Sequence, residues 1–185
     1  MSMIRPYDEK DREKVQALCV ENAGCNEADE SLKQFILTMY CNYYIDQEPE
    51  NCFVAVDEND DAIGYIFCTE NCDAYEKKFT EVYIPQTAKL GLKYFIDAKL
   101  DLITHTMFRT QYPAHLHIDI CSDYQGMGIG TKLLERLKSH LMSKGVSSCM
   151  LVCGSDNTGA IRFYERNGYT QLITTHLGTA MGIEF

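Results

Sequence analysis

The sequence predicts an α/β fold, in which a central sheet is covered by helices, and two neighbouring patterns carry this prediction. Apolar and polar residues alternate from His115 to Ile120, which is the period of a strand whose two faces meet different surroundings. From Ile129 to Leu141 the apolar residues recur three and four positions apart, as on a helix with one buried face. We therefore expect a strand, a glycine-rich loop and a helix at the centre of the fold.

The same two periods assign most of the other elements. Strands are expected at 3–7, 52–56, 62–68, 148–153, 170–175 and 179–184, and helices from 8 to a stop at 23–24, over 31–44 and over 157–166. The polar run 57–61 suits the turn of a hairpin. Residues 71–113 are harder to assign: 79–84 is expected to be extended, and 87–106 to hold one or two helices.

Length and composition predict one globular domain, residues 1–185. The chain has 185 residues, of which 45% are hydrophobic, and this is enough for a sizeable core. No apolar run is long enough to span a bilayer, and the first residues lack the apolar core of a signal peptide. We expect a cytoplasmic protein that makes no membrane contact.

The nine cysteines predict reduced thiols rather than disulfides or a metal site. Their number is odd, they are scattered along the chain, and several lie inside apparent strands or helices. The pairs Cys68/Cys72 and Cys149/Cys153 have no accompanying second pair of the kind that binds zinc. We expect no bound metal.

The charge balance excludes one class of partner. The formal net charge is −10, whereas a protein that binds a phosphate backbone needs a basic surface. Nucleic acid is therefore not expected as a partner. An acidic surface mildly favours a cationic partner such as an amine.

The loop Gln125-Gly126-Met127-Gly128-Ile129-Gly130 predicts an anion site. Closely spaced glycines let the backbone turn tightly and approach a ligand, and the free N–H groups of a helix that begins there attract phosphate. The glycine spacing differs from the dinucleotide fingerprint, and Gly130-Thr131 lacks the lysine of a phosphate-binding P-loop. A turn without a ligand is the alternative.

Two motifs resemble the GNAT superfamily of acyl-CoA-dependent N-acetyltransferases. The first is Gln/Arg-x-x-Gly-x-Gly, present here as Gln125, Gly128 and Gly130. The second is Asn-x-x-Ala-x-x-Phe/Leu-Tyr-Glu-x-x-Gly-Phe/Tyr, which 157–169 matches closely. The resemblance implies a GNAT fold, with a mixed, mostly antiparallel central sheet flanked by helices on both faces. Residues 71–113 would be an insertion into that fold, shaping the acceptor site or an oligomer surface such as that of a homodimer.

The resemblance also implies a cofactor site. Acetyl-CoA would be the co-substrate, with its pyrophosphate on the backbone amides of the glycine loop and its pantetheine arm in a gap between the central strand and the next one. The residues implied are Ile118, Ile120, Gln125, Gly126, Met127, Gly128, Ile129, Gly130, Thr131 and Asn157.

The expected reaction is direct attack of an amine on the thioester in a ternary complex. A protonated amine must first lose a proton, and His117 and Asp119 are the best candidates for the base because they share one strand face just before the loop. By resemblance, Tyr164 would give a proton to the departing thiolate. Buried structural roles are the alternatives for all three residues. The acceptor, a small-molecule or peptide amine, is not readable from the sequence.

The sequence also leaves open a function without catalysis. The segment from Pro113 to Ile120 also resembles acetyltransferase-like domains found beside O-GlcNAc hydrolases, some of which are thought not to use acetyl-CoA. A GNAT-fold binding module without catalysis is therefore the alternative to an acetyltransferase, although the retained Gln125, Asn157 and Tyr164 favour the enzyme.

Overall fold

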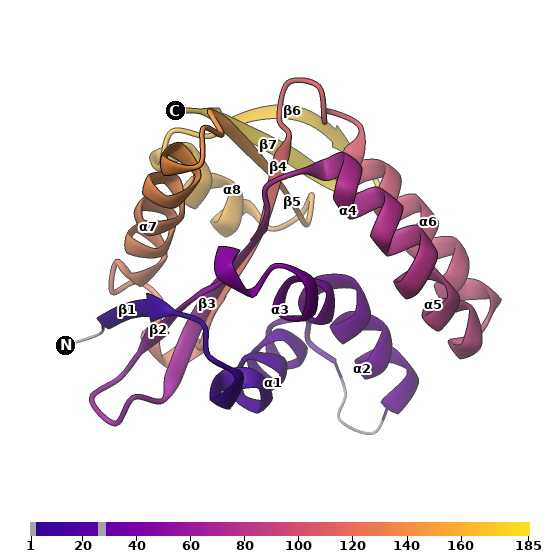
Figure 1. Ribbon diagram of the computed structural model, residues 1–185, viewed down its shortest axis with the longest axis horizontal. Coiled ribbons are helices and arrows are strands. Elements are labelled where there is room, and N and C mark those ends of the chain that lie inside the picture. Colours follow the sequence, from indigo (N-terminus) through magenta and orange to yellow (C-terminus); the bar gives the residue numbers. More distant parts are fainter. Residues whose placement is uncertain (1–2, 26–28) are drawn as a thin grey trace.

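A seven-stranded sheet in the order β1-β2-β3-β4-β5-β7-β6 organises the chain (Figure 1). The computed structural model describes residues 3–25 and 29–185. The strands are β1 Met3–Pro6, β2 Phe53–Val56, β3 Ala62–Thr69, β4 Ala114–Ile120, β5 Ser148–Cys153, β6 Thr170–Thr175 and β7 Gly178–Glu184. Neighbouring strands are antiparallel except β4 and β5, which are parallel. The expected mixed, mostly antiparallel sheet is confirmed.

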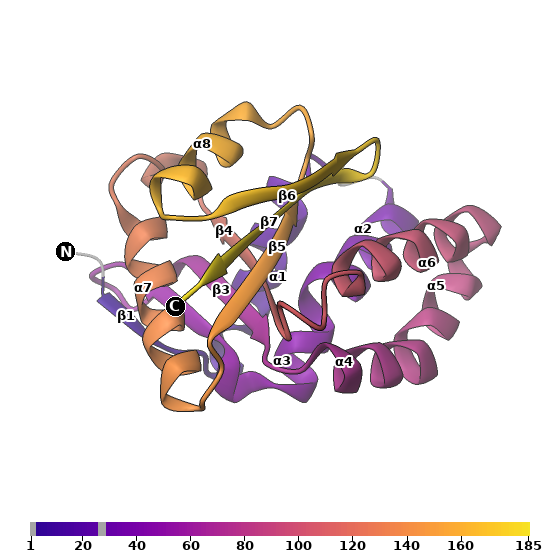
Figure 2. The same ribbon diagram turned by 90° about the horizontal axis from the view of Figure 1, so that it is seen from above.

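Helices cover both faces of this sheet, as expected. They are α1 Arg12–Asn22, α2 Glu30–Leu37, α3 Tyr43–Gln47, α4 Cys72–Lys78, α5 Ile84–Leu90, α6 Leu92–Thr106, α7 Ile129–Ser143 and α8 Thr158–Arg166. Short π-helical segments, Thr38–Asn42 and Phe79–Tyr83, join α2 to α3 and α4 to α5. Figures 1 and 2 show α4, α5 and α6 on the opposite side of the molecule from α7. No helix in 3–25 or 29–185 is both long and apolar enough to cross a bilayer.

Strand alternation divides the core into two layers. On one face, Tyr65 and Phe67 of β3 pack with side chains of α1 to α6, while on the other face Ile66 and Leu116 pack against α7 and its neighbours. The leucines of α7 recur at the spacing of one helical face, which explains why Leu133, Leu137 and Leu141 are all buried. Six cysteines are buried free thiols, as expected: Cys19, Cys41, Cys52, Cys68, Cys72 and Cys149.

The segment 79–84 is helical, so its predicted extended conformation was wrong. It forms a π-helical turn followed by the start of α5. The β-branched and aromatic residues there favoured a strand in the sequence, but Phe79, Tyr83 and Ile84 are buried on one side of a helix. Packing decided the conformation, as is common for short apolar runs. The prediction of one or two helices over 87–106 is confirmed: α5 and α6 meet at Gly91, where φ is +135°.

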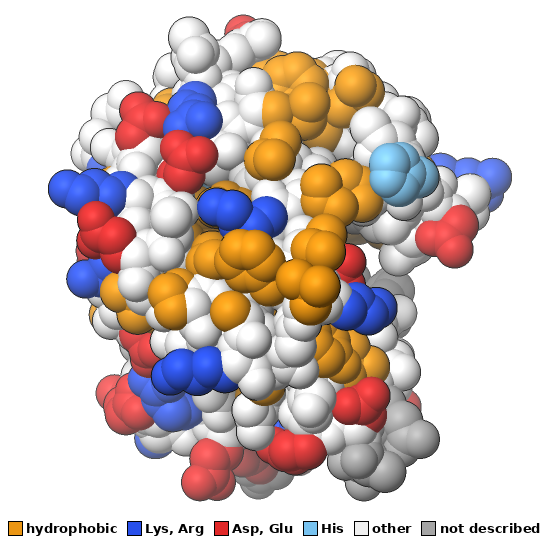
Figure 3. Space-filling model, turned by 90° about the vertical axis from the view of Figure 1, so that its right-hand side faces the viewer, with side chains coloured by type: hydrophobic (Ala, Val, Ile, Leu, Met, Phe, Trp, Pro, Cys, Tyr) orange, Lys and Arg blue, Asp and Glu red, His pale blue; other side chains and the backbone are white. Residues whose placement is uncertain are grey.

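One face of α6 is apolar and exposed. Its large side chains, together with that of Met107 directly after the helix, are 39–74% exposed and follow each other at helical spacing: Leu92, Ile96, Leu100, Ile103 and Met107. Figure 3 shows apolar side chains gathered on this side of the molecule. We call these five residues the α6 stripe.

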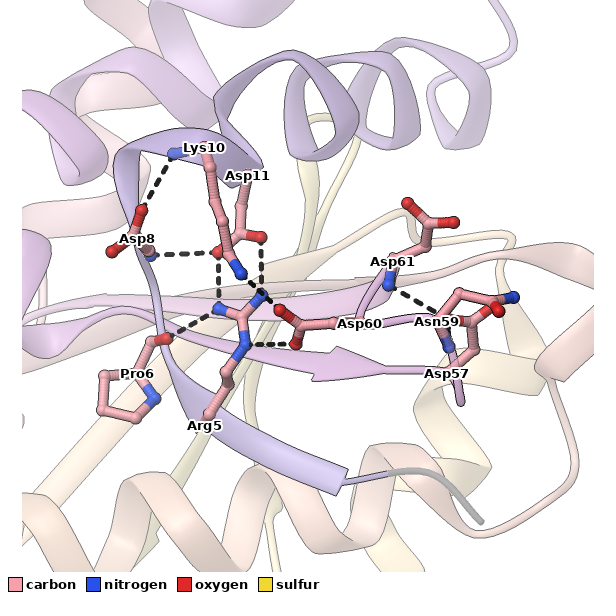
Figure 4. Close-up of polar contacts among 9 residues, drawn as sticks. All are labelled: Arg5, Pro6, Asp8, Lys10, Asp11, Asp57, Asn59, Asp60 and Asp61. Atoms are coloured by element: carbon pink, nitrogen blue, oxygen red, sulfur yellow. Dashed lines mark hydrogen bonds and ion pairs between the residues drawn. The ribbon is translucent and has the colours of Figure 1, made fainter.

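A charged network holds β1 to the rest of the sheet edge (Figure 4). Arg5 of β1 donates two hydrogen bonds to the carboxylate of Asp11, at 2.7 and 2.8 Å, and one to Asp60 in the turn between β2 and β3, at 2.8 Å. Asp11 is only 4% exposed and also accepts the backbone N–H of Asp8. An open hollow beside this network is lined by 3–10 and 56–60, none of which belongs to β4, β5 or the glycine loop.

Replacement of Asp11 should therefore destabilise the protein. We expect Asp11→Ala to lower the free energy of unfolding by about 2 kcal/mol, because it leaves the Arg5 guanidinium and the Asp8 amide without their shared acceptor. Urea denaturation measures this change. Lys10→Ala is the matched control, since it removes only the exposed ion pair with Asp60 and should cost less than about 1 kcal/mol. Equal losses in the two variants would contradict this account.

Candidate functional site

The glycine loop between β4 and α7 forms an open cradle of backbone amides. Gly126 and Gly128 have φ of +76° and +77°, values that residues other than glycine rarely adopt. A Cβ at either position would meet no atom within 4 Å. Gly128 also precedes the first turn of α7, and no side chain caps that turn. The N–H groups of Ile129, Gly130 and Thr131 therefore have no partner within the helix and are available to an anion.

The third glycine of the motif has a different role. A Cβ on Gly130 would lie 2.8 Å from the Phe163 ring of α8 and 3.1 Å from the end of the Ile120 side chain. Only glycine lets the start of α7 approach α8 this closely. The Gln125 side chain donates a hydrogen bond to the Ile120 carbonyl at 3.0 Å and so ties the loop to the end of β4. Met127 is 63% exposed on the outside of the loop.

Strands β4 and β5 diverge beside this cradle. Their ladder consists of two residue pairs, Ala114 with Cys149 and His115 with Met150, after which β4 continues to Ile120 without a partner on that edge. The N–H of Cys121 donates to Ile63 on the β3 side. Because backbone groups of successive strand residues point to alternate edges, those of Ile118 and Ile120 point away from β3 and into the gap. The divergence of these two strands thus leaves backbone groups of β4 without a strand partner; the Ile120 carbonyl accepts the Gln125 side chain, and the others are available to a ligand.

Helix α8 packs in the same cluster as the Ile118 and Ile120 side chains. Asn157 caps this helix: its side-chain oxygen accepts the N–H of Ala160 at 3.0 Å, which leaves its amide nitrogen without a partner among the described residues. Tyr164 is 8% exposed, and its hydroxyl makes no hydrogen bond in the described chain yet is not among the fully buried polar atoms that lack one. The ring is therefore packed while the hydroxyl is reached by solvent. The helix ends at Arg166, and the left-handed backbone that the sequence predicted at 167–168 is adopted by Gly168, where φ is +88°, but not by Asn167.

His117 and Asp119 meet at one hydroxyl group. The two side chains lie on the same face of β4, as expected, and are 24% and 20% exposed. Tyr65, which pairs with Asp119 in the β3–β4 ladder, donates a hydrogen bond to Asp119 Oδ2 at 2.5 Å and lies 3.2 Å from His117 Nδ1. The closest approach between His117 and Asp119 themselves is 3.8 Å. Tyr65 thus links the two candidate bases.

The surroundings of His117 and Asp119 shift the pKa of each side chain in the direction that favours its neutral form. Burial raises the pKa of Asp119 to about 7, and the hydrogen bond from Tyr65 opposes this only in part. Burial, together with the nearby His105, lowers the pKa of His117 to about 4. The carboxyl is therefore the group of the pair that gains or loses a proton near neutral pH. Burial also raises the pKa of Tyr164, which remains protonated at neutral pH.

Helix α6 contacts this group through Tyr40. The Tyr40 ring stacks on the His117 ring, with centroids 5.4 Å apart, and its hydroxyl donates to Asp101 of α6 at 3.2 Å. The other carboxylate oxygen of Asp101 lies 3.1 Å from His105 Nδ1. Burial opposes a charge on His105, but Asp101 outweighs it and raises the His105 pKa. Residues 71–113 therefore hold, through Asp101, the tyrosine ring that stacks on His117.

His115, further along the same strand face, has a structural environment. It is fully buried, its Nε2 lies 2.9 Å from the Tyr44 hydroxyl and its Nδ1 lies 3.5 Å from Cys72 Sγ. Both ring nitrogens are thus occupied. Burial lowers the pKa of His115 well below its usual value.

One other side chain completes the cluster around Tyr65. Ligand atoms of Cys19, His117 and Asp119 lie within 4.8 Å of one another, a combination of residue types that could suit a metal ion. The Tyr65 hydroxyl already lies between His117 and Asp119, so the two atoms that face each other, His117 Nδ1 and Asp119 Oδ2, have a partner without a cation. We interpret the group as a hydrogen-bonded cluster, and the absence of a bound metal remains a prediction.

The sequence did not identify Tyr65, Tyr40, Cys19 or Asp101 as site residues. Tyr65 is one of several aromatic residues in a strand that is buried along its whole length, so its side chain resembled core. Its place beside Asp119 depends on the β3–β4 register, which strand periodicity does not fix. Tyr40 lies in the π-helical segment, a feature often found at functional sites but without a sequence signature.

Comparison with known proteins identifies the family of this chain. The chain belongs to the acetyltransferase (GNAT) family, whose family model matches residues 15–169.

Individual relatives agree with this assignment. The chain is 28% identical over 127 residues to the N-alpha-acetyltransferase 30 of Schizosaccharomyces pombe, a match that covers 69% of this chain and 62% of that relative. Among solved structures, SsHAT superposes with a TM-score of 0.86 at 26% identity, covering 99% of this chain and 98% of its own. The PaiA N-acetyltransferase of Thermoplasma acidophilum, in complex with coenzyme A, has a TM-score of 0.63 at 16% identity, with coverage of 100% and 99%, which shows a shared fold.

Burial of the Asp119 carboxyl predicts an unusual pH dependence of stability. Its pKa rises from about 4 in the unfolded chain to about 7 in the folded protein, so the folded state holds this proton more tightly. The stability from this site is complete below pH 4 and is lost as the pH rises through 7. We expect Asp119→Asn to be more stable than the wild type at pH 8, by roughly 1–3 kcal/mol.

Urea denaturation of both proteins between pH 5 and 8 measures this difference. The gain should shrink steadily as the pH falls toward 5, because the wild-type carboxyl then becomes neutral as well. A gain that does not change with pH, or a loss at pH 8, would show that the Asp119 carboxyl is not protonated in the folded protein near pH 7.

Proposed function

We propose that this protein transfers an acetyl group from acetyl-CoA to an amine, by direct attack of the amine in a ternary complex. The observation that carries the proposal is the divergence of β4 and β5 directly beside the uncapped start of α7. An anion-binding cradle and a strand edge with unpaired backbone groups suit a long ligand that has a pyrophosphate at one end and an amide-containing arm at the other.

The cofactor contacts follow from these features. The backbone amides of residues 126–131 would hold the pyrophosphate, and Gln125 would act by keeping the loop against Ile120. Backbone groups of Ile118 and Ile120 would bond the pantetheine arm as a strand does, together with the free amide nitrogen of Asn157 at the start of α8. The neighbouring PaiA structure contains coenzyme A, which supports an acyl-CoA in this fold.

The chemistry requires three functions, and the gap offers a group for each. His117 and Asp119 would remove the proton of the amine, and backbone N–H groups of β4 would stabilise the tetrahedral oxyanion. Tyr164 would protonate the departing thiolate, since its pKa is raised and its hydroxyl has no other partner in the described chain. A neutral Tyr164 hydroxyl that holds its proton tightly suits a donor that acts only when a thiolate develops beside it.

The acceptor is proposed as a small-molecule or peptide amine. A net charge of −10 favours the approach of a cationic acceptor. The fission yeast relative is named an N-alpha-acetyltransferase, which favours a peptide amine among the candidates. Thiol release in the presence of amine and peptide panels would identify the acceptor.

Calorimetric titration tests the cofactor site directly. We expect acetyl-CoA to bind in the micromolar range, about −8 kcal/mol, and Gly128→Val to abolish binding because a side chain there would enter the cradle and strain the loop. Gly145→Val is the matched control: Gly145 also has a positive φ, +80°, with nothing within 4 Å, but lies beyond the far end of α7. It should carry the same strain and still bind. No wild-type binding at millimolar acetyl-CoA would favour the non-catalytic binding module instead.

Replacement of Tyr164 tests the proposed acid. Tyr164→Phe keeps the ring packing and removes the proton, so kcat should fall at least about 100-fold while the acetyl-CoA Kd changes little. Tyr169→Phe is the control, because Tyr169 is similarly buried and its ring contacts Tyr164 at a centroid distance of 5.7 Å. Its kcat should stay near the wild-type value. An unaltered kcat in Tyr164→Phe would remove this residue from the mechanism.

A further inference from the structure

The Tyr65 hydroxyl fixes the direction of a hydrogen-bond chain on β4. A hydroxyl has one proton, and Tyr65 lies nearer to Asp119 Oδ2, at 2.5 Å, than to His117 Nδ1, at 3.2 Å. An ionised carboxylate can only accept, so the Tyr65 proton must point to Asp119 when that group is charged. The hydroxyl oxygen is then the acceptor for His117, whose Nδ1 must carry the hydrogen. His117 Nε2 is left as an unprotonated nitrogen.

The unprotonated nitrogen is open to a substrate. His117 Nε2 makes no hydrogen bond with any described residue, and it is not among the fully buried polar atoms that lack a partner, so solvent reaches it. The imidazole ring is held on one face by the Tyr40 ring. A lone pair on a positioned, accessible nitrogen is what abstraction of a proton from an amine requires.

We propose that Tyr65 is a positioning residue of the acetyl transfer, which sets the tautomer of His117 and conducts the amine proton from His117 to Asp119. This inference rests on the proposed function. It assigns the two candidate bases different roles: His117 contacts the amine, and Asp119 stores the proton.

The proton transfers balance without a charged histidine as the end state. An N–H bond of the protonated amine breaks and a bond to His117 Nε2 forms, while the Nδ1 hydrogen passes to the Tyr65 oxygen and the original Tyr65 hydrogen passes to Asp119 Oδ2. The amine gains the lone pair that attacks the thioester. Asp119 ends as a neutral carboxylic acid, Tyr65 is again a neutral phenol, and His117 is the neutral Nε2–H tautomer.

The buried environment agrees with this assignment. Burial lowers the pKa of His117 to about 4 and raises that of Asp119 to about 7, so a proton delivered near neutral pH rests on the carboxyl. Protonated Asp119 donates back to Tyr65, which then donates to His117 Nδ1, so below pH 7 the chain runs in reverse and Nε2 carries the hydrogen. Activity should therefore need ionised Asp119.

Other titratable groups face this chain from every element packed against it. They are Cys19 of α1, Tyr40 beside it, Asp101 and His105 of α6, His115 of β4 and Tyr164 of α8. Burial keeps Cys19 and His115 neutral around pH 7, and Tyr40 and Tyr164 have raised pKa values. The Asp101–His105 pair is bonded to itself, at 3.1 Å. Within the Asp119–Tyr65–His117 chain, Asp119 is thus the group whose charge changes near pH 7; His105, whose pKa Asp101 raises, titrates outside that chain.

Nitrogen-15 NMR of the histidine rings tests the hydrogen-bond chain of His117, Tyr65 and Asp119 in the protein alone, without acetyl-CoA or an acceptor. The His117 signal is assigned from its loss in His117→Gln. We expect the Nδ1–H tautomer at pH 9, the Nε2–H tautomer at pH 5.5 and a crossover near pH 7. Tyr65→Phe should abolish the crossover, and so should Asp119→Asn, because its side chain cannot ionise. The Nε2–H tautomer at pH 9, or a crossover that survives Tyr65→Phe, would overturn the proposal.

Tyr44→Phe is the matched control for stability. Tyr44 is as deeply buried as Tyr65 and bonds a histidine of the same strand face, His115 Nε2, at 2.9 Å. Both variants remove one buried hydroxyl, so both should lose similar stability. Only Tyr65→Phe should change the His117 tautomer.

Kinetics separate positioning from a merely structural role. We expect Tyr65→Phe to lower kcat by about 10- to 100-fold, with the KM for the amine within about threefold of wild type, and to lose the rise in kcat around pH 7. Tyr44→Phe should keep the wild-type pH profile. A Tyr65→Phe profile identical to wild type, or activity that survives His117→Gln, would make Asp119 the direct base and reject the relay. If the wild type shows the tautomer crossover but no turnover, the proposed acetyl transfer is contradicted while the hydrogen-bond chain is retained.

Discussion

The parallel pairing of β4 with β5 ends after two residue pairs, and the rest of the candidate site depends on that. A sheet normally satisfies its own backbone groups, whereas here the edge of β4 beyond His115 faces a gap. The loop that follows needs glycine at 126 and 128 for its backbone and at 130 for its contact with α8. The open edge of β4 thus follows from the end of this pairing, and the glycines of the loop place the cradle beside it.

The candidate base on β4 combines a buried hydroxyl group with two partly exposed side chains. Tyr65 is completely buried, while His117 and Asp119 remain about one-fifth to one-quarter exposed. Burial shifts their pKa values in opposite directions, and the hydroxyl between them lets a proton move without creating a charged imidazole. The buried carboxyl reduces stability above neutral pH, which is the type of cost that functional sites commonly carry.

Much of the fold was readable from the sequence because periodicity reports which face of an element is buried. The strand at 115–120 and the helix from Ile129 follow directly from their apolar spacing. The segment 79–84 did not, because β-branched and aromatic residues suit a buried helix as well as a strand once Tyr43 of α3 packs against Phe79 and Tyr83. Tyr65 was missed for another reason: its role comes from strand register, and register is a property of two strands rather than of one.

The α6 stripe has a consequence for how the protein behaves in solution. Its five apolar side chains, Leu92, Ile96, Leu100, Ile103 and Met107, are exposed on one helix face, and at neutral pH a net charge of −10 repels one copy from another. Acid removes that repulsion as carboxylates become protonated, yet leaves the stripe unchanged. Colloidal stability is therefore lowest in mildly acidic, high-salt solution, where charge no longer opposes contact between apolar surfaces.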